Sequence, residues 1–159
     1  MFKTIALSGV SDKGKTTCLQ KVIGHFKKEE LVDLLHGSTE DLDKIFKKQI
    51  VLSNKNCSKD FIAVFEKHGK RIGITTYGDS VEALDDAFSR MQPYNCQVYV
   101  CACHPHGKTI DFVKKESEDF IIHDCWAVET SIDCNSFRDV AQNIQVAEIY
   151  QEIIQLAKN

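Results

Sequence analysis

The feature that most constrains the fold is the alternation of short apolar runs with amphipathic segments along the chain. Short apolar runs bounded by polar or turn residues predict buried strands, and apolar residues spaced three and four apart predict helices. Strands that alternate with helices form a mostly parallel sheet, because each crossover helix packs against a face of that sheet. We therefore expect an α/β fold.

The expected strands are apolar runs at residues 2–8, 61–66, 71–76, 96–103 and 120–128. The second and third runs flank the tetrapeptide KHGK, in which Gly69 can adopt the positive φ that a tight turn requires. These two runs predict an antiparallel hairpin, which contributes the one antiparallel strand of the otherwise parallel sheet.

The expected helices lie between and after these strands. Apolar residues at helical spacing predict a helix from Lys15 to about residue 30. A short helix is expected within 38–49, where hydroxyl and acidic residues precede apolar positions, and a loop over 53–60. Further helices are expected from about Ser80, over 109–117 and from about Ser136 onward, the last as one long helix or two shorter ones.

Length and charge narrow the class of protein. The 159 residues fit one domain spanning 1–159, which is large enough to bury a core without disulfides. A formal net charge of −3 provides no overall basic field for a nucleic-acid backbone, so nucleic acid is not indicated as a partner. The chain shows no targeting pattern and no membrane-length apolar run, so we expect a soluble, cytoplasmic protein.

The seven cysteines do not form the even-numbered framework of a small disulfide-rich protein. Several lie inside apolar runs, so we expect reduced, buried thiols. The segment CACHPH, from Cys101 to His106, brings two cysteines and two histidines close together and could hold zinc. A strand followed by a proline turn explains the same residues, and we favour this second interpretation.

The most specific motif follows the first expected strand. The segment SGVSDKGKTT matches the pattern G-x-x-x-x-G-K-[ST] at Gly9, Gly14, Lys15 and Thr16. An expected strand precedes it and an expected helix follows it. At these residues the chain resembles the P-loop nucleoside triphosphatases (NTPases). The alternative is a chance glycine turn with a surface lysine, but strand, spacing and helix all agree with the motif.

The resemblance implies a phosphate-binding site and assigns roles within it. Glycines let the loop turn its backbone N–H groups toward a triphosphate, and the positive end of the following helix points at the same phosphates. Lys15 would contact the β- and γ-phosphates as a catalytic residue, whereas the Thr16 hydroxyl would ligate Mg²⁺. The implied nucleotide-binding residues are Gly9, Ser11, Asp12, Lys13, Gly14, Lys15, Thr16 and Thr17.

P-loop enzymes add an acidic residue at the end of another strand, where it holds Mg²⁺ directly or through water. Asp79 follows the expected strand 71–76 and is our candidate for this catalytic and metal-binding role. Glu66 ends the preceding strand at the turn of the hairpin, on the wrong edge of the sheet. Asp79 and Glu82 also match the D-x-x-E pattern of a helix capping box, which needs no metal, and both roles are open.

Other residues near this edge are weaker candidates. Thr75 and Thr76 could contact a γ-phosphate or its attacking water, but threonine is common within strands. The loop HPHGKT presents His104, His106 and Lys108, which could bind phosphate or an acceptor. A proline turn with solvated side chains is the more common explanation of such a loop.

The layout of an antiparallel hairpin followed by an acidic loop is similar to that of small GTPases. That family reads guanine through Asn-Lys-x-Asp after a later strand, where this chain has HPHGK. We therefore favour ATP over GTP as the nucleotide.

Three functions fit these residues. We favour Mg²⁺-dependent hydrolysis of a nucleoside triphosphate; the alternatives are a kinase for a small molecule or nucleotide, and a non-catalytic nucleotide-binding partner module. The arginines that could clamp an acceptor or a transferred phosphoryl group are only Arg71, Arg90 and Arg138. The small number of arginines therefore favours hydrolysis over a kinase activity. An NTPase can borrow an arginine from a protein partner or second subunit and turn over slowly alone.

Overall fold

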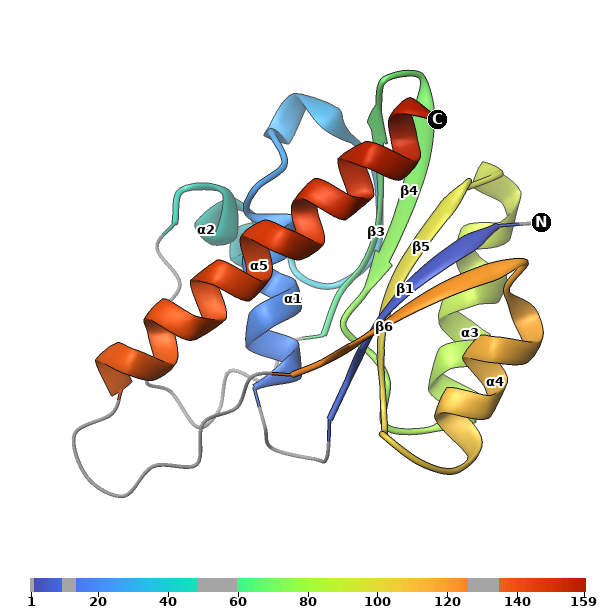
Figure 1. Ribbon diagram of the computed structural model, residues 1–159. Coiled ribbons are helices and arrows are strands. Elements are labelled where there is room, and N and C mark those ends of the chain that lie inside the picture. The colour runs from blue at the N-terminus through green and yellow to red at the C-terminus, as the bar shows by residue number, and fades with distance from the viewer. Residues whose placement is uncertain (1, 10–13, 49–59, 126–134) are drawn as a thin grey trace.

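The computed structural model describes residues 2–9, 14–48, 60–125 and 135–159, except the side chains of 135–139. Within these ranges six strands form one sheet, in the spatial order β2-β3-β4-β5-β1-β6 (Figure 1). The strands are β1 (Lys3–Ser8), β2 (Leu31–His36), β3 (Ile62–Lys67), β4 (Lys70–Thr75), β5 (Val98–Cys103) and β6 (Asp119–Asp124).

The directions of the strands agree in part with those expected. β1 pairs in parallel with β5 and β6, and β4 is also parallel to β5. β3 is antiparallel to both of its neighbours, β2 and β4. The mostly parallel α/β sheet and the β3–β4 hairpin are therefore confirmed, while β2 adds an antiparallel pairing that the sequence analysis does not anticipate.

Helices cover both faces of the sheet (Figure 1). They are α1 (Lys15–Ile23), α2 (Thr39–Phe46), α3 (Val81–Met91), α4 (Lys108–Glu116) and α5 (Asn135–Lys158), with 3₁₀ turns η1 (Lys28–Glu30) and η2 (Gln92–Tyr94). Successive side chains of β1 enter two different cores, as the period of a strand requires. Ile5 and Leu7 pack with α1, α2 and α5, whereas Ala6 packs with α3 and α4.

The first helix is shorter than expected, and a missed strand follows it. α1 ends at Ile23, and the backbone N–H of Gly24 donates to the carbonyl of Gln20 at 3.0 Å. Phe26 continues the helical spacing but lies beyond the helix, where the chain turns toward β2. β2 is a half-buried edge strand, and its sequence LVDLLH has neither the alternation of a surface strand nor a helical period.

The other elements lie close to their expected positions. α5 is one continuous helix rather than two shorter ones. Residues 126–128 of the last expected strand and 53–59 of the expected loop lie outside the described residues. Among the described helices none is both long and apolar enough to cross a membrane.

The described cysteines are free thiols. Those that are buried, as expected, are Cys18, Cys96, Cys101 and Cys103. Cys57 and Cys134 lie outside the described residues. Burial raises the pKa of the Cys18 thiol to about 12, so this group stays protonated at neutral pH.

Candidate functional site

The carboxyl ends of the parallel strands meet at one edge of the sheet, and α1 begins at the same edge (Figure 1). At the end of β1, Ser8 is level with Cys103 of β5 and with Asp124 of β6. In open α/β sheets ligands collect at this edge, because loops and helix N-termini converge there. The candidate residues that the structure describes are all found here.

Lys15 turns inward at this edge. Its Nζ donates to the backbone carbonyls of Gly9 at 2.7 Å and Cys103 at 3.2 Å, and the residue is 6% exposed. A buried ammonium group is costly unless carbonyls or anions take the place of water around it. The chain therefore holds a positive charge between Gly9 and Cys103, and among the described residues two carbonyl dipoles and the Asp79 carboxylate balance it.

Gly9 and Gly14 lie before and after the loop that joins β1 to α1; the backbone of Gly14 favours glycine, and a side chain at Gly9 would be tightly packed. Gly14 has φ 80° and ψ 15°, a left-handed conformation, at the N-cap of α1. A Cβ at Gly9 would lie 3.2 Å from the Cβ of Cys125 and 3.4 Å from the Cδ of Lys15. The N-cap of α1 is Gly14, which has no side chain to accept a hydrogen bond from the first backbone N–H groups of the helix. Such N–H groups can instead bind an anion.

The remaining loop candidates are only partly within the described residues. Thr16 and Thr17 are half-buried in the first turn of α1, beside Lys15. Ser11, Asp12 and Lys13 lie outside the described residues, so their nucleotide-binding roles stay predictions.

Asp79 reaches Lys15 even though β5 separates β4 from β1. Its Oδ1 is 3.9 Å from the Nζ of Lys15. The loop after β4 crosses β5 at Gly78, where an added Cβ would lie 2.3 Å from the carbonyl oxygen of Ala102. The backbone N–H of Ala102 also donates to the carbonyl of Tyr77 at 3.3 Å. The absence of a side chain at residue 78 is therefore what lets the carboxylate approach the lysine.

The capping-box interpretation of Asp79 is wrong. The N-cap of α3 is Ser80, whose Oγ accepts from the backbone N–H of Ala83 at 3.1 Å. The cap is therefore made one residue later than the D-x-x-E pattern indicates. Asp79 is left with a side chain that is 81% exposed and directed to the site.

His104 joins the site from the end of β5. Its Nε2 lies 3.3 Å from the carbonyl oxygen of Asp79 and 3.9 Å from the Oδ1 of the same residue. Its backbone N–H donates to Thr109 Oγ1 at 2.9 Å, which fixes the turn into α4. His106 and Lys108 from the same loop are exposed.

The two strand threonines support the structure of this edge. The hydroxyl of Thr76 donates to Asp60 at 2.6 Å and accepts from the backbone N–H of Phe61 at 2.9 Å. Thr75 Oγ1 accepts from the backbone N–H of Tyr77 at 3.1 Å, and both threonines are buried. These contacts fit the interpretation of both residues as structural parts of the strand ends.

The structure adds Gln142 of α5, which sequence reasoning missed. This residue is 8% exposed, and its Nε2 donates to the carbonyl of Gly14 at 3.3 Å. The contact ties a helix near the C-terminus to the first turn of α1. A glutamine in a long amphipathic segment carries no local signal of such a contact, because its partner is 128 positions away in sequence.

The thiol of Cys103 lies beneath the same site. Burial raises its pKa to about 11, and the nearby charge of Lys15 acts in the opposite direction. Cys101 and Cys103 both belong to the core under α3 and α4. In the described part of the chain no three histidine, cysteine or acidic residues are arranged to hold a metal ion by themselves.

The oxygen donors at this edge nevertheless suit a hard cation. Asp79 offers an exposed carboxylate and Thr16 a hydroxyl. Mg²⁺ is commonly held by one or two protein oxygens, with water and substrate phosphates completing its octahedron. The donor set therefore fits Mg²⁺ that arrives together with a phosphorylated ligand.

Comparison of the chain with protein-family models, with curated proteins and with solved structures finds no match.

Proposed function

We propose that this chain binds a nucleoside triphosphate, with ATP favoured over GTP, and hydrolyses it with Mg²⁺ as a small P-loop NTPase. On this proposal the helix-covered sheet is a three-layer P-loop NTPase-like fold, and the loop after β1 encloses the phosphates. The observation that carries the proposal is the geometry of Lys15. Its buried ammonium group lies against two backbone carbonyls, 3.9 Å from the carboxylate of Asp79.

The charge pattern supports phosphate as the ligand. Carbonyl dipoles are weaker partners for an ammonium group than phosphate oxygens, so a polyphosphate would exchange a weak partner for a strong one. The positive end of α1 adds to the same attraction. The ammonium group of Lys15 and the N-terminal end of α1 lie at the same end of the sheet, so both would attract the same ligand.

Mg²⁺ would be held by the Thr16 hydroxyl and the Asp79 carboxylate. When bound, the ion neutralises charge on the phosphate oxygens. Lys15 would contact the same phosphates through its ammonium group, and the first backbone N–H groups of α1 would donate to them. The Nε2 of His104 lies 3.3 Å from the backbone carbonyl of Asp79, and on this proposal that contact helps to hold the loop that carries the carboxylate.

Slow turnover by the isolated chain is part of the proposal. Arg71 donates to the carbonyl of Tyr94 at 3.2 Å, and Arg90 pairs with Asp86 at 3.0 Å. The partner of Arg71 is in η2, the turn after α3, and the partner of Arg90 is in α3 itself. The third, Arg138, has a side chain outside the described residues. An arginine supplied by a protein partner or a second subunit would raise the rate by about 10³–10⁵.

A panel of nucleotides tested by thermal unfolding, with and without Mg²⁺, examines the proposal. At a concentration about 100 times its Kd, a ligand adds about 2.7 kcal/mol, or roughly 5–10 °C for a domain of this size. ATP with Mg²⁺ should give the largest shift and free nucleoside none. If no triphosphate raises the unfolding temperature, the proposal is wrong.

Phosphate release then tests catalysis separately from binding. The isolated chain should release phosphate slowly, and the rate should fall to background when Asp79 is changed to Asn. A rate on the order of tens per second for the chain alone would contradict the borrowed arginine.

A further inference from the structure

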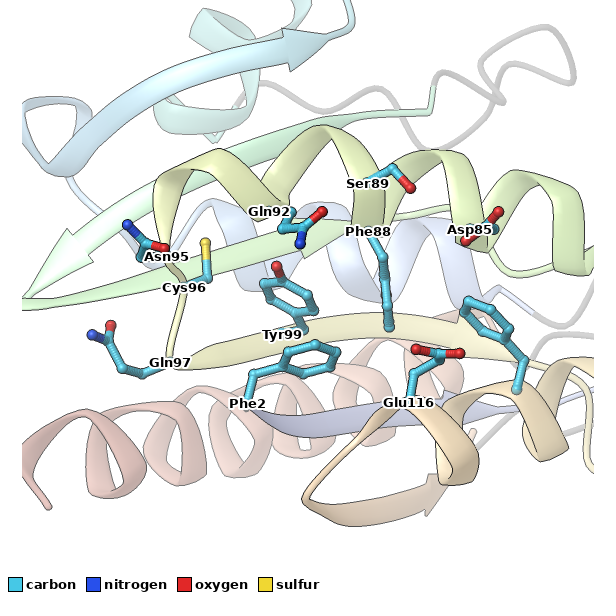
Figure 2. A pocket seen from close by; sticks show the side chains of 11 residues that line it. Phe2, Asp85, Phe88, Ser89, Gln92, Asn95, Cys96, Gln97, Tyr99 and Glu116 are labelled. Atoms are coloured by element: carbon cyan, nitrogen blue, oxygen red, sulfur yellow. The ribbon is translucent and has the colours of Figure 1, made fainter.

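A cavity of about 530 Å³ opens between α3 and α4, at the amino ends of β1 and β5 (Figure 2). It therefore lies at the end of the sheet opposite Lys15 and shares no residue with the candidate phosphate site. Its volume is within the range of pockets that hold small organic ligands, about 300–1,000 Å³.

Four aromatic side chains line this cavity: Phe2, Phe88, Tyr99 and Phe112. The ring centroid of Phe2 is 4.1 Å from that of Tyr99 and 5.6 Å from that of Phe88. Phe88 in turn lies 4.9 Å from Tyr99 and 5.6 Å from Phe112. Ring faces carry partial negative charge, so a cluster of this kind attracts cations as well as apolar groups.

Two carboxylates stand at the rim, Asp85 on α3 and Glu116 on α4 (Figure 2). Both are exposed, and neither forms an ion pair with any described residue. No lysine or arginine lines the cavity. Arg71 does not line the cavity, although its positive charge acts to lower the pKa of the lining residue Cys96. Its guanidinium group donates to the carbonyl of Tyr94. The lining is therefore negatively charged.

The hydroxyl of Tyr99 points into the cavity, toward Gln92 in Figure 2. Tyr99 is 3% exposed, and its hydroxyl has no hydrogen-bond partner in the described part of the chain. Among the described residues no fully buried side-chain oxygen lacks a partner, so the unpartnered Tyr99 hydroxyl is open to the cavity and available to a ligand. Burial raises the pKa of Tyr99 to about 12, so the hydroxyl is neutral at physiological pH and can donate or accept.

We propose that this cavity binds a small organic ammonium compound. The apolar part of the ligand would lie against Phe2, Phe88 and Phe112, the ammonium group would face Asp85 and Glu116, and Tyr99 would hydrogen-bond a polar atom. Charge complementarity selects this class, because an anion would meet two carboxylates and no cation. A neutral apolar ligand would leave the Tyr99 hydroxyl and both carboxylates without a partner.

The test is a titration with 2-phenylethylamine and benzyltrimethylammonium, followed by amide shifts in ¹⁵N-labelled protein. The opposite-charge control is 3-phenylpropanoate, and the neutral control is 2-phenylethanol. Both ammonium compounds should shift the backbone signals of Ser89, Asn95 and Gln97 with saturation, and the carboxylate should not. If the carboxylate binds as tightly as the ammonium compounds, or if neither ammonium compound shifts these signals, the proposal is overturned.

Substitutions then test the two features that define the site. Asp85→Asn together with Glu116→Gln should weaken ammonium binding by about tenfold, because two partly solvated charges are lost. Tyr99→Phe should weaken binding of 2-amino-1-phenylethanol, whose hydroxyl can bond Tyr99 beside its ammonium group, and should leave benzyltrimethylammonium, which has no second polar atom, unchanged. Glu82→Gln removes an exposed charge from α3 outside the cavity and should leave binding unchanged. Unchanged affinity in the double variant would overturn the proposal.

Discussion

The two ends of the sheet present opposite chemistry, although the same strands, β1 and β5, run between them. At the carboxyl edge a buried lysine and the N-terminal end of α1 lie together, and we propose that they attract an anion. At the amino edge four aromatic rings and two carboxylates that form no ion pair with a described residue line a cavity, and we propose that it binds a cation. The centre of each strand packs in the hydrophobic core. The chemical character of each end therefore depends on the few residues just beyond the ends of the strands.

The largest expected effect comes from Lys15→Ala at the carboxyl edge. Loss of the ammonium group should weaken binding of Mg·ATP by about 100-fold, because a charged hydrogen-bond donor is removed from the phosphates. Binding of ammonium compounds at the amino edge should not change. The measurement is calorimetric titration of each ligand.

Lys21→Ala is the matched control for that substitution. Lys21 lies on the same helix and donates to Asn143 at 3.0 Å on the exposed surface. Its removal should leave both affinities unchanged. Equal weakening of Mg·ATP binding by the two substitutions would show that helix charge in general, rather than the position of Lys15, attracts the nucleotide.

Gly78→Ala should disturb the carboxyl edge through sterics. The new Cβ would lie 2.3 Å from the carbonyl oxygen of Ala102, so the loop must lift and carry Asp79 away from Lys15. The free energy of unfolding should fall by about 1–3 kcal/mol, and the Mg²⁺ dependence of nucleotide binding should weaken. Denaturant unfolding and titration with and without Mg²⁺ measure the two effects.

Gly69→Ala separates this clash from the general cost of replacing a glycine. Gly69 has a positive φ of 75° at the β3–β4 turn, with nothing within 4 Å of an added Cβ. That variant should lose stability through backbone strain alone and keep its full affinity for Mg·ATP. If Gly78→Ala retains wild-type Mg²⁺ dependence, Asp79 does not act with Lys15 as described.

Gln142→Ala tests the contact between α5 and Gly14 at the start of α1. Loss of the hydrogen bond to Gly14 should cost about 1 kcal/mol of stability and weaken Mg·ATP binding several-fold. Gln151→Ala, an exposed position on the same helix, should change neither quantity. Equal effects of the two variants would show that Gln142 has no specific role in the site.

Alkaline pH tests whether the two ends differ at their buried thiols. Burial raises the pKa of Cys96, at the amino edge, to about 12, and that of Cys103 to about 11. The unfolded chain releases these protons from about pH 9, whereas the folded chain keeps them, so the free energy of unfolding falls as pH rises above 9. Each thiol should contribute about 1 kcal/mol to the fall between pH 9 and 10.

Cys96→Ala and Cys103→Ala should therefore flatten that fall by similar amounts, because both folded pKa values exceed 10. The measurement is denaturant unfolding at pH 8, 9 and 10. A fall that Cys96→Ala flattens and Cys103→Ala does not would mean that the charge of Lys15 lowers the pKa of Cys103 far more than burial raises it.

The sequence predicted the carboxyl-edge site better than the amino-edge cavity, for a physical reason. The motif from Gly9 to Thr17 is contiguous, so its glycines and Lys15 were identified together, but of the observed contacts of Lys15 only that with Gly9 lies within the motif. The approach of Asp79 was predicted only as one of two roles, since a capping pattern and a metal-ligand pattern share the same acidic residue. The structure decides against the cap by placing Ser80 there.

Contacts between distant parts of the chain could not be predicted. The crossing of Gly78 over Ala102 depends on strand order, and the order β4-β5-β1 is set by packing rather than by any local pattern. The aromatic cavity combines Phe2 with residues of α3 and α4, each of which looks like ordinary core in sequence. β2 was missed because an edge strand of six residues has too few buried positions to show a period.

Calorimetric titration of the wild-type chain with a non-hydrolysable ATP analogue and Mg²⁺ tests the central claim most directly. We predict one saturable site per chain, affinity that falls when Mg²⁺ is removed, and competition by inorganic pyrophosphate. Absence of binding, or binding that pyrophosphate does not displace, would contradict the claim that the loop around Lys15 is built to hold a polyphosphate.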